Sequence, residues 1–322
     1  MPPSVVSPWR RLRRAVIGDS IDLADQSIFH KLSLIAFFAW VGLGADGLSS
    51  SCYGPAEAYL ALGQHTVLAV FVALGTALTI GVISAAYSQI IELFPTGGGG
   101  YVVASKLLSP TIGMVSGCAL LIDYVLTITL SVASGADALF SFLPASWLPA
   151  RLTVAVAGVV LLTVLNMRGV KESVTALVPI FLVFVLTHAA VIFYGLGAHL
   201  GNFPELVAAT SRDVQAAHTE LGWAVVILLL LRAYSMGAGA FTGIEAVSNG
   251  LPILREPRGK TGKRAMLYMA VSLSLAVTGL TLCYLLFQVR LQPGKTLNAA
   301  LFEAITASWG PFWGGRSEEH TS

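Results

Sequence analysis

Long apolar runs alternate along the chain with short segments that hold most of its charged residues. Each run carries at most two charged side chains, and seven runs approach or exceed the roughly 20 apolar residues that a helix needs to cross a bilayer. The pattern therefore predicts seven transmembrane helices, at 33–62, 67–94, 112–143, 152–166, 174–199, 222–251 and 264–289. A further apolar stretch at 297–313 is shorter and amphipathic, so we expect it to form a helix on the outer surface.

Glycines interrupt two of these spans, the first at 42–47, with Gly54 and Pro55 following, and the sixth at 235–243. Glycine is unfavourable inside a helix, and unwound backbone in a membrane is tolerated only against protein or a water-filled cavity. A pair of glycine-interrupted spans in corresponding positions is typical of secondary transporters, which bind their substrates at the breaks. Close packing of glycine-rich helices is the alternative explanation for either span alone.

A proline at 95 and four glycines at 97–100 end the second span. This composition cannot continue a helix, so we expect a re-entrant or interfacial turn on the inner side. A phosphate-binding loop would need a Lys and a Ser or Thr directly after the glycines, and the sequence has neither there.

Composition agrees with a membrane protein, because 55% of the 322 residues are hydrophobic and only 11% are charged, against about 25% charged in soluble domains. The net charge of +2 gives no reason to expect a nucleic-acid partner. Three widely separated cysteines, Cys52, Cys118 and Cys283, indicate neither a disulfide framework nor a metal site.

Lysine and arginine are distributed unevenly between the two sides of the predicted spans. With the N-terminus inside, 13 of them fall in inner segments and 4 in outer segments, leaving aside Arg232 within a span and Arg316. The positive-inside rule then predicts a cytoplasmic N-terminal segment, 1–32, and a multi-pass protein of the plasma (inner) membrane. That segment lacks the apolar stretch of a signal peptide.

The last residues, 316–322, match what a common sequencing adapter encodes when it is translated. We interpret them as an artefact and exclude them from the fold. The natural chain is then expected to be cut near Gly315.

Three carboxylic acids lie within the apolar spans, where each ionisable residue costs roughly 2.5–3.5 kcal/mol on insertion scales and suggests a function. Asp46 is in the first break, Asp123 is in the third span, and Glu245 follows the second break. No lysine accompanies them. Arg232 is the cation to consider nearby, and it could pair with Asp137 or Glu57.

Further oxygen-bearing side chains surround these acids. Thr127 and Ser131 follow Asp123 at spacings of four and eight, so the three share one helix face. Carboxylate, hydroxyl and carbonyl oxygens replace the water shell of a hard cation. The sequence therefore predicts a cation site built from Asp46, Tyr53, Asp123, Tyr124, Thr127, Ser131, Thr242 and Glu245.

Four stretches resemble the amino acid–polyamine–organocation (APC) superfamily, and within it the KimA-type potassium importers. The stretch 93–101 resembles the inner-loop signature of the superfamily. The stretches 42–57, 123–131 and 241–245 are similar to the potassium importers, and the resemblance extends over about 30–290.

The resemblance implies an all-α polytopic protein with a LeuT-like fold of two inverted five-helix repeats. Residues 33–199 would form the first repeat, 200–221 an outer loop and 222–313 the start of the second. It also implies proton-coupled potassium uptake, with ion contacts at the eight positions of the predicted cation site. Members of the family have about twelve spans, a further tyrosine contact in the tenth and a cytosolic C-terminal regulatory domain, and they are often homodimers.

Two transport functions follow, and an enzyme is not expected because no nucleophile–base pair or metal-ligand cluster stands out. The first is potassium import and the alternative is an amino acid or polyamine permease. An ionised Asp46 would repel a substrate carboxylate and attract a cation, which favours potassium.

Asp46 and Asp123 are the expected ion ligands, and Glu245 is the expected proton-coupling residue, because crowded acids in a poorly hydrated site cannot all stay ionised. The expected partners are potassium ions, protons and the lipid bilayer, and no cofactor is expected.

Overall fold

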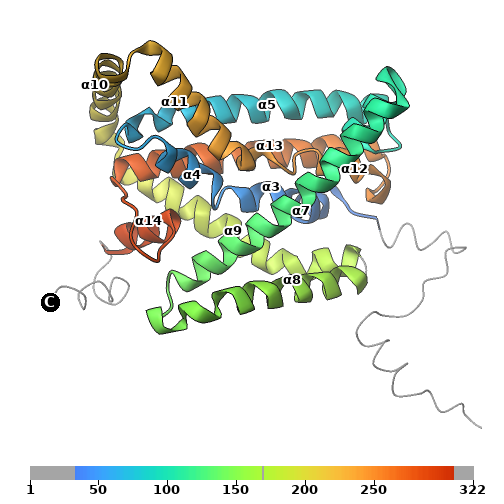
Figure 1. The fold of residues 1–322 in the computed structure, drawn as a ribbon. Helices are drawn as coiled ribbons and strands as arrows, with labels where there is room; N and C mark the ends of the chain where they lie inside the picture. The colour runs from blue at the N-terminus through green and yellow to red at the C-terminus, as the bar shows by residue number, and fades with distance from the viewer. Residues whose placement is uncertain (1–32, 169, 308–322) are drawn as a thin grey trace, which may run out of the picture.

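The computed structural model describes residues 33–168 and 170–307, which form a helical bundle with one isolated backbone bridge, between Leu34 and Leu254 (Figure 1). The predicted cytoplasmic segment 1–32 and the adapter-like residues 316–322 lie outside the described residues. The principal helices are α3 (Ala36–Ser50), α4 (Gly54–Ala61), α5 (Ala69–Leu93), α6 (Gly99–Val103), α7 (Pro110–Phe140), α8 (Arg151–Arg168), α9 (Val170–Ala198), α10 (Phe203–Leu221), α11 (Trp223–Met236), α12 (Ala246–Asn249), α13 (Arg258–Leu286) and α14 (Leu297–Thr306).

Six helical stretches are long and apolar enough to cross a membrane, and they match the second to seventh predicted spans. The first predicted span consists of α3 and α4, which are separated by a turn at 51–53. The first predicted span is therefore interrupted, because its long apolar stretch is divided into two short helices.

The first interruption lies later in the chain than the sequence analysis placed it. Helix α3 runs unbroken through 42–47 and ends at Ser50, so the prediction of a break at those glycines is wrong. Gly42 lies within the helix, and its Cβ position is 2.4 Å from a methyl group of Val174 on α9, so small size serves close packing there. Pro55, in the first turn of α4, is what prevents a continuous helix, because it lacks an N–H and its ring would clash with the preceding turn.

The second interruption lies where the sequence predicted it. Helix α11 ends at Met236, a 3₁₀ turn covers Gly237–Phe241 (η5), and the chain is extended at Thr242. Gly243 has φ of +84°, a conformation that few other residues adopt, and the short helix α12 follows.

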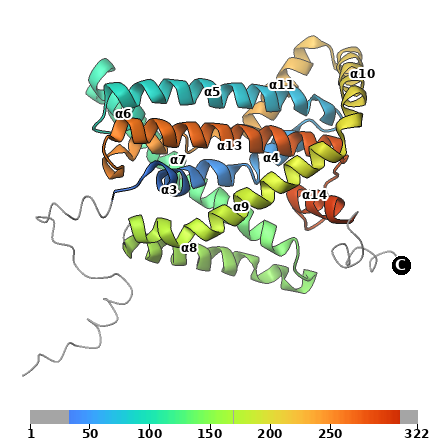
Figure 2. The same ribbon diagram turned by 180° about the vertical axis from the view of Figure 1, so that it is seen from behind.

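Helix α13 is the centre of the bundle and packs along α5, α3 and α9 (Figure 2). Helices α7 and α8 lie together at one side, and most of their apolar side chains are exposed, as expected of surfaces that face lipid or further protein. One hydrophobic cluster surrounds Tyr59 and Tyr284, and a second surrounds Ile244 and Met269.

The two ends of the bundle differ. At the first, which we call the α10 end, α10 and α14 lie at the same end of the bundle as α4 (Figure 1). The segment 200–221, expected to be a loop, is largely the amphipathic helix α10. Six of the ten residues of α14 are buried, so this helix is sunk into the bundle and does not lie only on its surface. The opposite end, the α6 end, holds α6, α12 and the glycine-rich turn before α6.

Candidate functional site

Asp46 of α3 lies directly against the second break. A Cβ atom placed on Gly243 would be 2.7 Å from Oδ2 of Asp46 and 3.0 Å from the backbone nitrogen of Gly47. Only glycine fits this contact, because the position combines positive φ with no room for a side chain. The carboxylate that was predicted to lie in the first break therefore contacts the unwound backbone of the second.

Helix α7 turns its polar residues toward α3. Thr127 is buried, with 4% of its surface exposed, whereas its neighbours Leu126 and Ile128 are 57% and 56% exposed. Ser131, one turn further on, lies 3.4 Å from Ser49 of α3, measured between the two hydroxyl oxygens. Asp123 is half-buried one turn before Thr127. The predicted shared face of α7 is thus the face that meets the broken helix.

Tyr53 and Thr242 meet at Gly239. Tyr53 is in the first break, and its hydroxyl is 3.1 Å from the hydroxyl of Ser50. A Cβ atom on Gly239 would lie 2.9 Å from the ring of Tyr53. Thr242 donates its hydroxyl to the Gly239 carbonyl at 2.9 Å. Each interrupted segment therefore contributes a hydroxyl group near the point where the two segments cross.

Glu245 begins a row of buried oxygens on α12. Among the described residues, its Oε1 has no hydrogen-bond partner, and the same holds for Ser248 Oγ and Asn249 Oδ1. These residues are spaced i, i+3 and i+4, so they share a face. Asn249 also donates from Nδ2 to the hydroxyl of Tyr124 on α7, at 2.8 Å. Buried oxygens without a protein partner are suited to a cation, a proton or water.

The three carboxylates gather around one crossing of the helices. Asp46 contacts Gly243, two residues before Glu245. Tyr124, which directly follows Asp123, accepts a hydrogen bond from Asn249 of α12. Within 33–168 and 170–307, no side chain forms an ion pair with any of the three. Asp137 pairs with Arg151 at 2.8 Å, and Arg232 forms no ion pair among the described residues, so its suggested pairing with Asp137 or Glu57 is wrong.

Sequence reasoning missed two residues that join the helices around the site. Ser49 links α3 to α7, and Asn249 links α12 to α7. The spacing of four residues between Glu245 and Asn249 was a usable signal for the second. Ser49 is one of three consecutive serines, and nothing in the sequence distinguishes it from Ser50 or Ser51.

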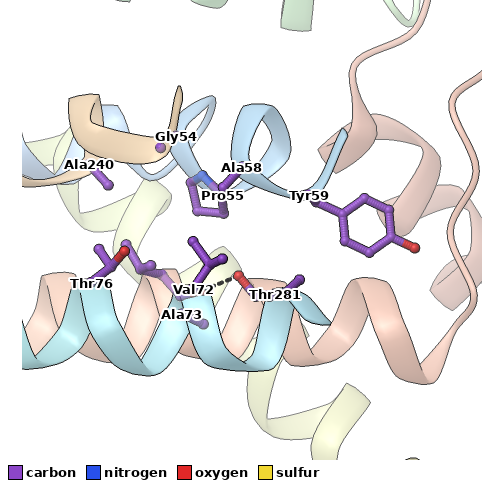
Figure 3. Close-up of a pocket in the computed structure, with 12 residues that line it drawn as sticks. Gly54, Pro55, Ala58, Tyr59, Val72, Ala73, Thr76, Ala240 and Thr281 are labelled. Carbon is purple, nitrogen blue, oxygen red and sulfur yellow. Dashed lines mark hydrogen bonds between the residues drawn. The ribbon is translucent and has the colours of Figure 1, made fainter. Parts of the chain in front are cut away.

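On the other side of the first break, the helices leave little space. Gly54, Pro55 and Ala240 face Val72 and Thr76 of α5 across a cavity of about 10 Å³ (Figure 3). Such a cavity accommodates about one water molecule at most. The polar groups that could hold an ion thus lie on the α7 side of the break and not between α4 and α5.

Comparison with known proteins gives one family and two transporters. A sequence profile described as amino acid permease matches residues 32–310. The potassium transporter KimA of Bacillus subtilis (strain 168) is 30% identical over 299 residues, which cover 90% of this chain and 47% of that protein. The low-affinity putrescine importer PlaP of Escherichia coli (strain K12) is 25% identical over 171 residues, which cover 51% of this chain and 34% of that importer. The chain thus spans less than half the length of these curated relatives.

Proposed function

The chain belongs to the amino acid permease family, and on that premise we propose that it is part of a secondary active transporter that imports potassium ions together with protons. The family has the LeuT-like fold, and the bundle is a multi-pass membrane protein. In this proposal 33–199 form the first inverted repeat and 222–313 begin the second. The α6 end faces the cytoplasm, together with the N-terminus, and the α10 end faces outward.

The contact between Asp46 and Gly243 carries the proposal. It brings a carboxylate, which no described residue neutralises, to the unwound backbone where the two interrupted spans cross. Two further acids lie beside the same crossing, because Glu245 follows Gly243 by two residues and Asp123 directly precedes Tyr124, which bonds Asn249. A site with this charge attracts a cation and repels the carboxylate of an amino acid.

Each residue of the predicted cation site has a place in this proposal. Asp46 and Asp123 bind the ion directly. The hydroxyls of Tyr53, Tyr124, Thr127, Ser131 and Thr242 provide neutral oxygens in place of water. Glu245 carries the coupled proton, and its unpartnered buried oxygen supports this role. Movement of one repeat against the other exposes the site to each side in turn, and the transporter is proposed to be a homodimer.

A polyamine or other amine is the second candidate substrate. The similarity to a putrescine importer over half of the chain favours it. A carboxylate site also suits an ammonium group, but a diamine needs space along its length. Competition between putrescine and rubidium for uptake therefore distinguishes the two candidate substrates.

Rubidium uptake in potassium-auxotrophic cells that express the complete gene tests the proposal. We expect Asp46→Asn and Asp123→Asn each to reduce uptake strongly, because each removes a charged ligand. Asp137→Asn is the matched control, since it removes an acid of the same helix that pairs with Arg151. Full uptake by both site variants would disprove the ion site. Uptake of putrescine in place of rubidium would establish the amine alternative.

A further inference from the structure

His65 lies in the turn between α4 and α5, at the α10 end of the bundle. Its backbone is fixed there, because its N–H donates to the Leu62 carbonyl at 3.1 Å and its carbonyl accepts from the N–H of Leu68 at 3.1 Å. The residue is 5% exposed, and its ring meets α10, which runs across this end of the bundle (Figure 1). A histidine outside the spans is therefore buried between the first interrupted span and α10.

Both nitrogens of the His65 ring face carboxylates of α10. Nδ1 lies 2.7 Å from Oδ1 of Asp213, a hydrogen-bond distance, and Nε2 lies 3.6 Å from Oε2 of Glu220, an ion-pair distance. Among the described residues, neither Nε2 of His65 nor Oδ2 of Asp213 has a hydrogen-bond partner, although both are buried. Gln64 holds Glu220 beside the ring by donating from Nε2 to its two carboxylate oxygens, at 3.2 and 3.1 Å.

The protonation state of the ring decides how many of these carboxylates it can bond. An ionised carboxylate only accepts, so the bond to Asp213 places a proton on Nδ1. A neutral imidazole then has no N–H for Glu220, whereas the imidazolium donates on both sides. Histidine is the side chain whose charge ordinarily changes between about pH 5 and 8.

The permanent cations nearby do not occupy this place. Arg212 of α10 pairs with Glu205 at 2.5 Å. Arg290, at the end of α13, lines the same groove as Gln64 and Arg212. In 33–168 and 170–307, no lysine or arginine forms an ion pair with Asp213 or Glu220. His65 is therefore the cation that the two carboxylates can share.

The cluster joins two parts of the bundle that are far apart in the chain. His65 and Asp213 are separated by 148 positions. His65 follows α4, the second half of the first interrupted span, and α10 leads into α11, which ends at the second break. Ala217 of α10, between the two acids, is fully buried in the apolar cluster around Tyr59. The ion pair thus adds a charge-dependent contact to an apolar one.

We propose that His65, Asp213 and Glu220 form a proton-binding site, separate from the ion site, that fastens α10 to the end of the first interrupted span. The proton is taken up at Nε2 of His65 from the solution at the α10 end. With the proton bound, the ring bonds both acids and α10 is held firmly. Without it, the contact with Glu220 is lost and α10 opens more often. That this solution is the external one rests on the proposed function, whereas the response of α10 to pH does not.

Hydrogen–deuterium exchange of α10 tests the site, because local opening sets the exchange rate of its amides. The complete protein in detergent is compared at about pH 5.5 and about pH 8, on either side of the usual range of histidine, with the rates corrected for the intrinsic effect of pH on exchange. We expect α10 of the unmodified protein to exchange about tenfold more slowly at the acid pH, the effect of one charge-assisted hydrogen bond on an opening equilibrium.

Two variants should remove this difference. His65→Gln cannot bind the proton, and Glu220→Gln removes the charge that faces Nε2 while leaving the buried bond to Asp213. Because the Glu220 side chain is 56% exposed, the second variant decides if the first does not fold. His218→Gln, which removes an exposed histidine from the same helix, is the matched control and should keep the difference.

The results separate this site from the proposed function. Exchange of α10 that does not depend on pH in the unmodified protein overturns the proton site, and so does a tenfold difference that survives both variants. Gln215→Cys places a thiol on the exposed side of α10, and its labelling in intact cells by a membrane-impermeant reagent supports an external site. A pH response of α10 without such labelling supports the proton site and contradicts the outward orientation in the proposed function.

Discussion

Gly243→Ala tests whether the contact between the two interrupted spans shapes the ion site. The residue has φ of +84°, and its missing Cβ atom would lie 2.7 Å from Oδ2 of Asp46. The backbone conformation alone costs a non-glycine residue about 1–2 kcal/mol. The new methyl group must also displace the carboxylate, because that distance is far below van der Waals contact.

The displacement can be converted into an expected loss of affinity. Ordinary contact begins near 3.4 Å, so the carboxylate must move by about 0.7 Å. With an effective dielectric constant of about 20, moving a unit charge from about 3 Å to about 3.7 Å from a monovalent cation weakens their attraction by about 1 kcal/mol. We therefore expect the KM for rubidium to rise about sixfold or more.

Gly294→Ala separates the cost of the backbone conformation from the clash with the carboxylate. Gly294 has φ of +75°, but no atom of the described residues lies within 4 Å of its Cβ position, so alanine there carries the backbone cost without the clash. The assay is rubidium uptake as a function of concentration, normalised to the amount of protein in the membrane. An unchanged KM in well-expressed Gly243→Ala would refute the placement of Asp46 at the ion. Equal changes in both variants would assign the effect to backbone strain.

Three further outcomes are expected. Glu245→Gln should remove the stimulation of uptake by external acid, because an amide cannot carry the coupled proton; uptake measured across external pH checks this, and a retained acid stimulation would move the coupling elsewhere. Tyr124→Phe removes the acceptor of the Asn249 hydrogen bond and should lower thermal stability in detergent by about 1 kcal/mol; an unchanged melting temperature would contradict that bond. Gly99→Ala should abolish uptake or insertion, because its Cβ would collide with the side-chain oxygen of Asn249, whereas Gly63→Ala, with similar φ and open space, should not; comparable uptake by both variants would contradict the close packing of the glycine-rich turn on α12.

Local patterns account for much of the fold. Apolar runs located the spans because a helix in lipid must satisfy its backbone within itself and present apolar side chains along its length. The second break at 235–243 was predictable, since its glycines adopt a 3₁₀ turn and a positive φ that depend little on neighbours. The shared face of Asp123, Thr127 and Ser131 follows from helical period alone.

Where prediction failed, the cause lay in competing local signals or in distant contacts. Glycines in α3 looked like a break, but they serve close packing, and the interruption belongs to Pro55. Helix α10 was missed because its polar residues resemble a loop until one apolar face meets the bundle.

The sequence by itself determined that this is a helical membrane protein with interrupted spans and acids in unusual places, because hydrophobicity and helical period act within one segment. Only the tertiary structure decided that Asp46 meets Gly243 and that His65 bonds Asp213. Those contacts join residues about 200 and 148 positions apart. Their geometry depends on how whole helices cross, which no local pattern encodes.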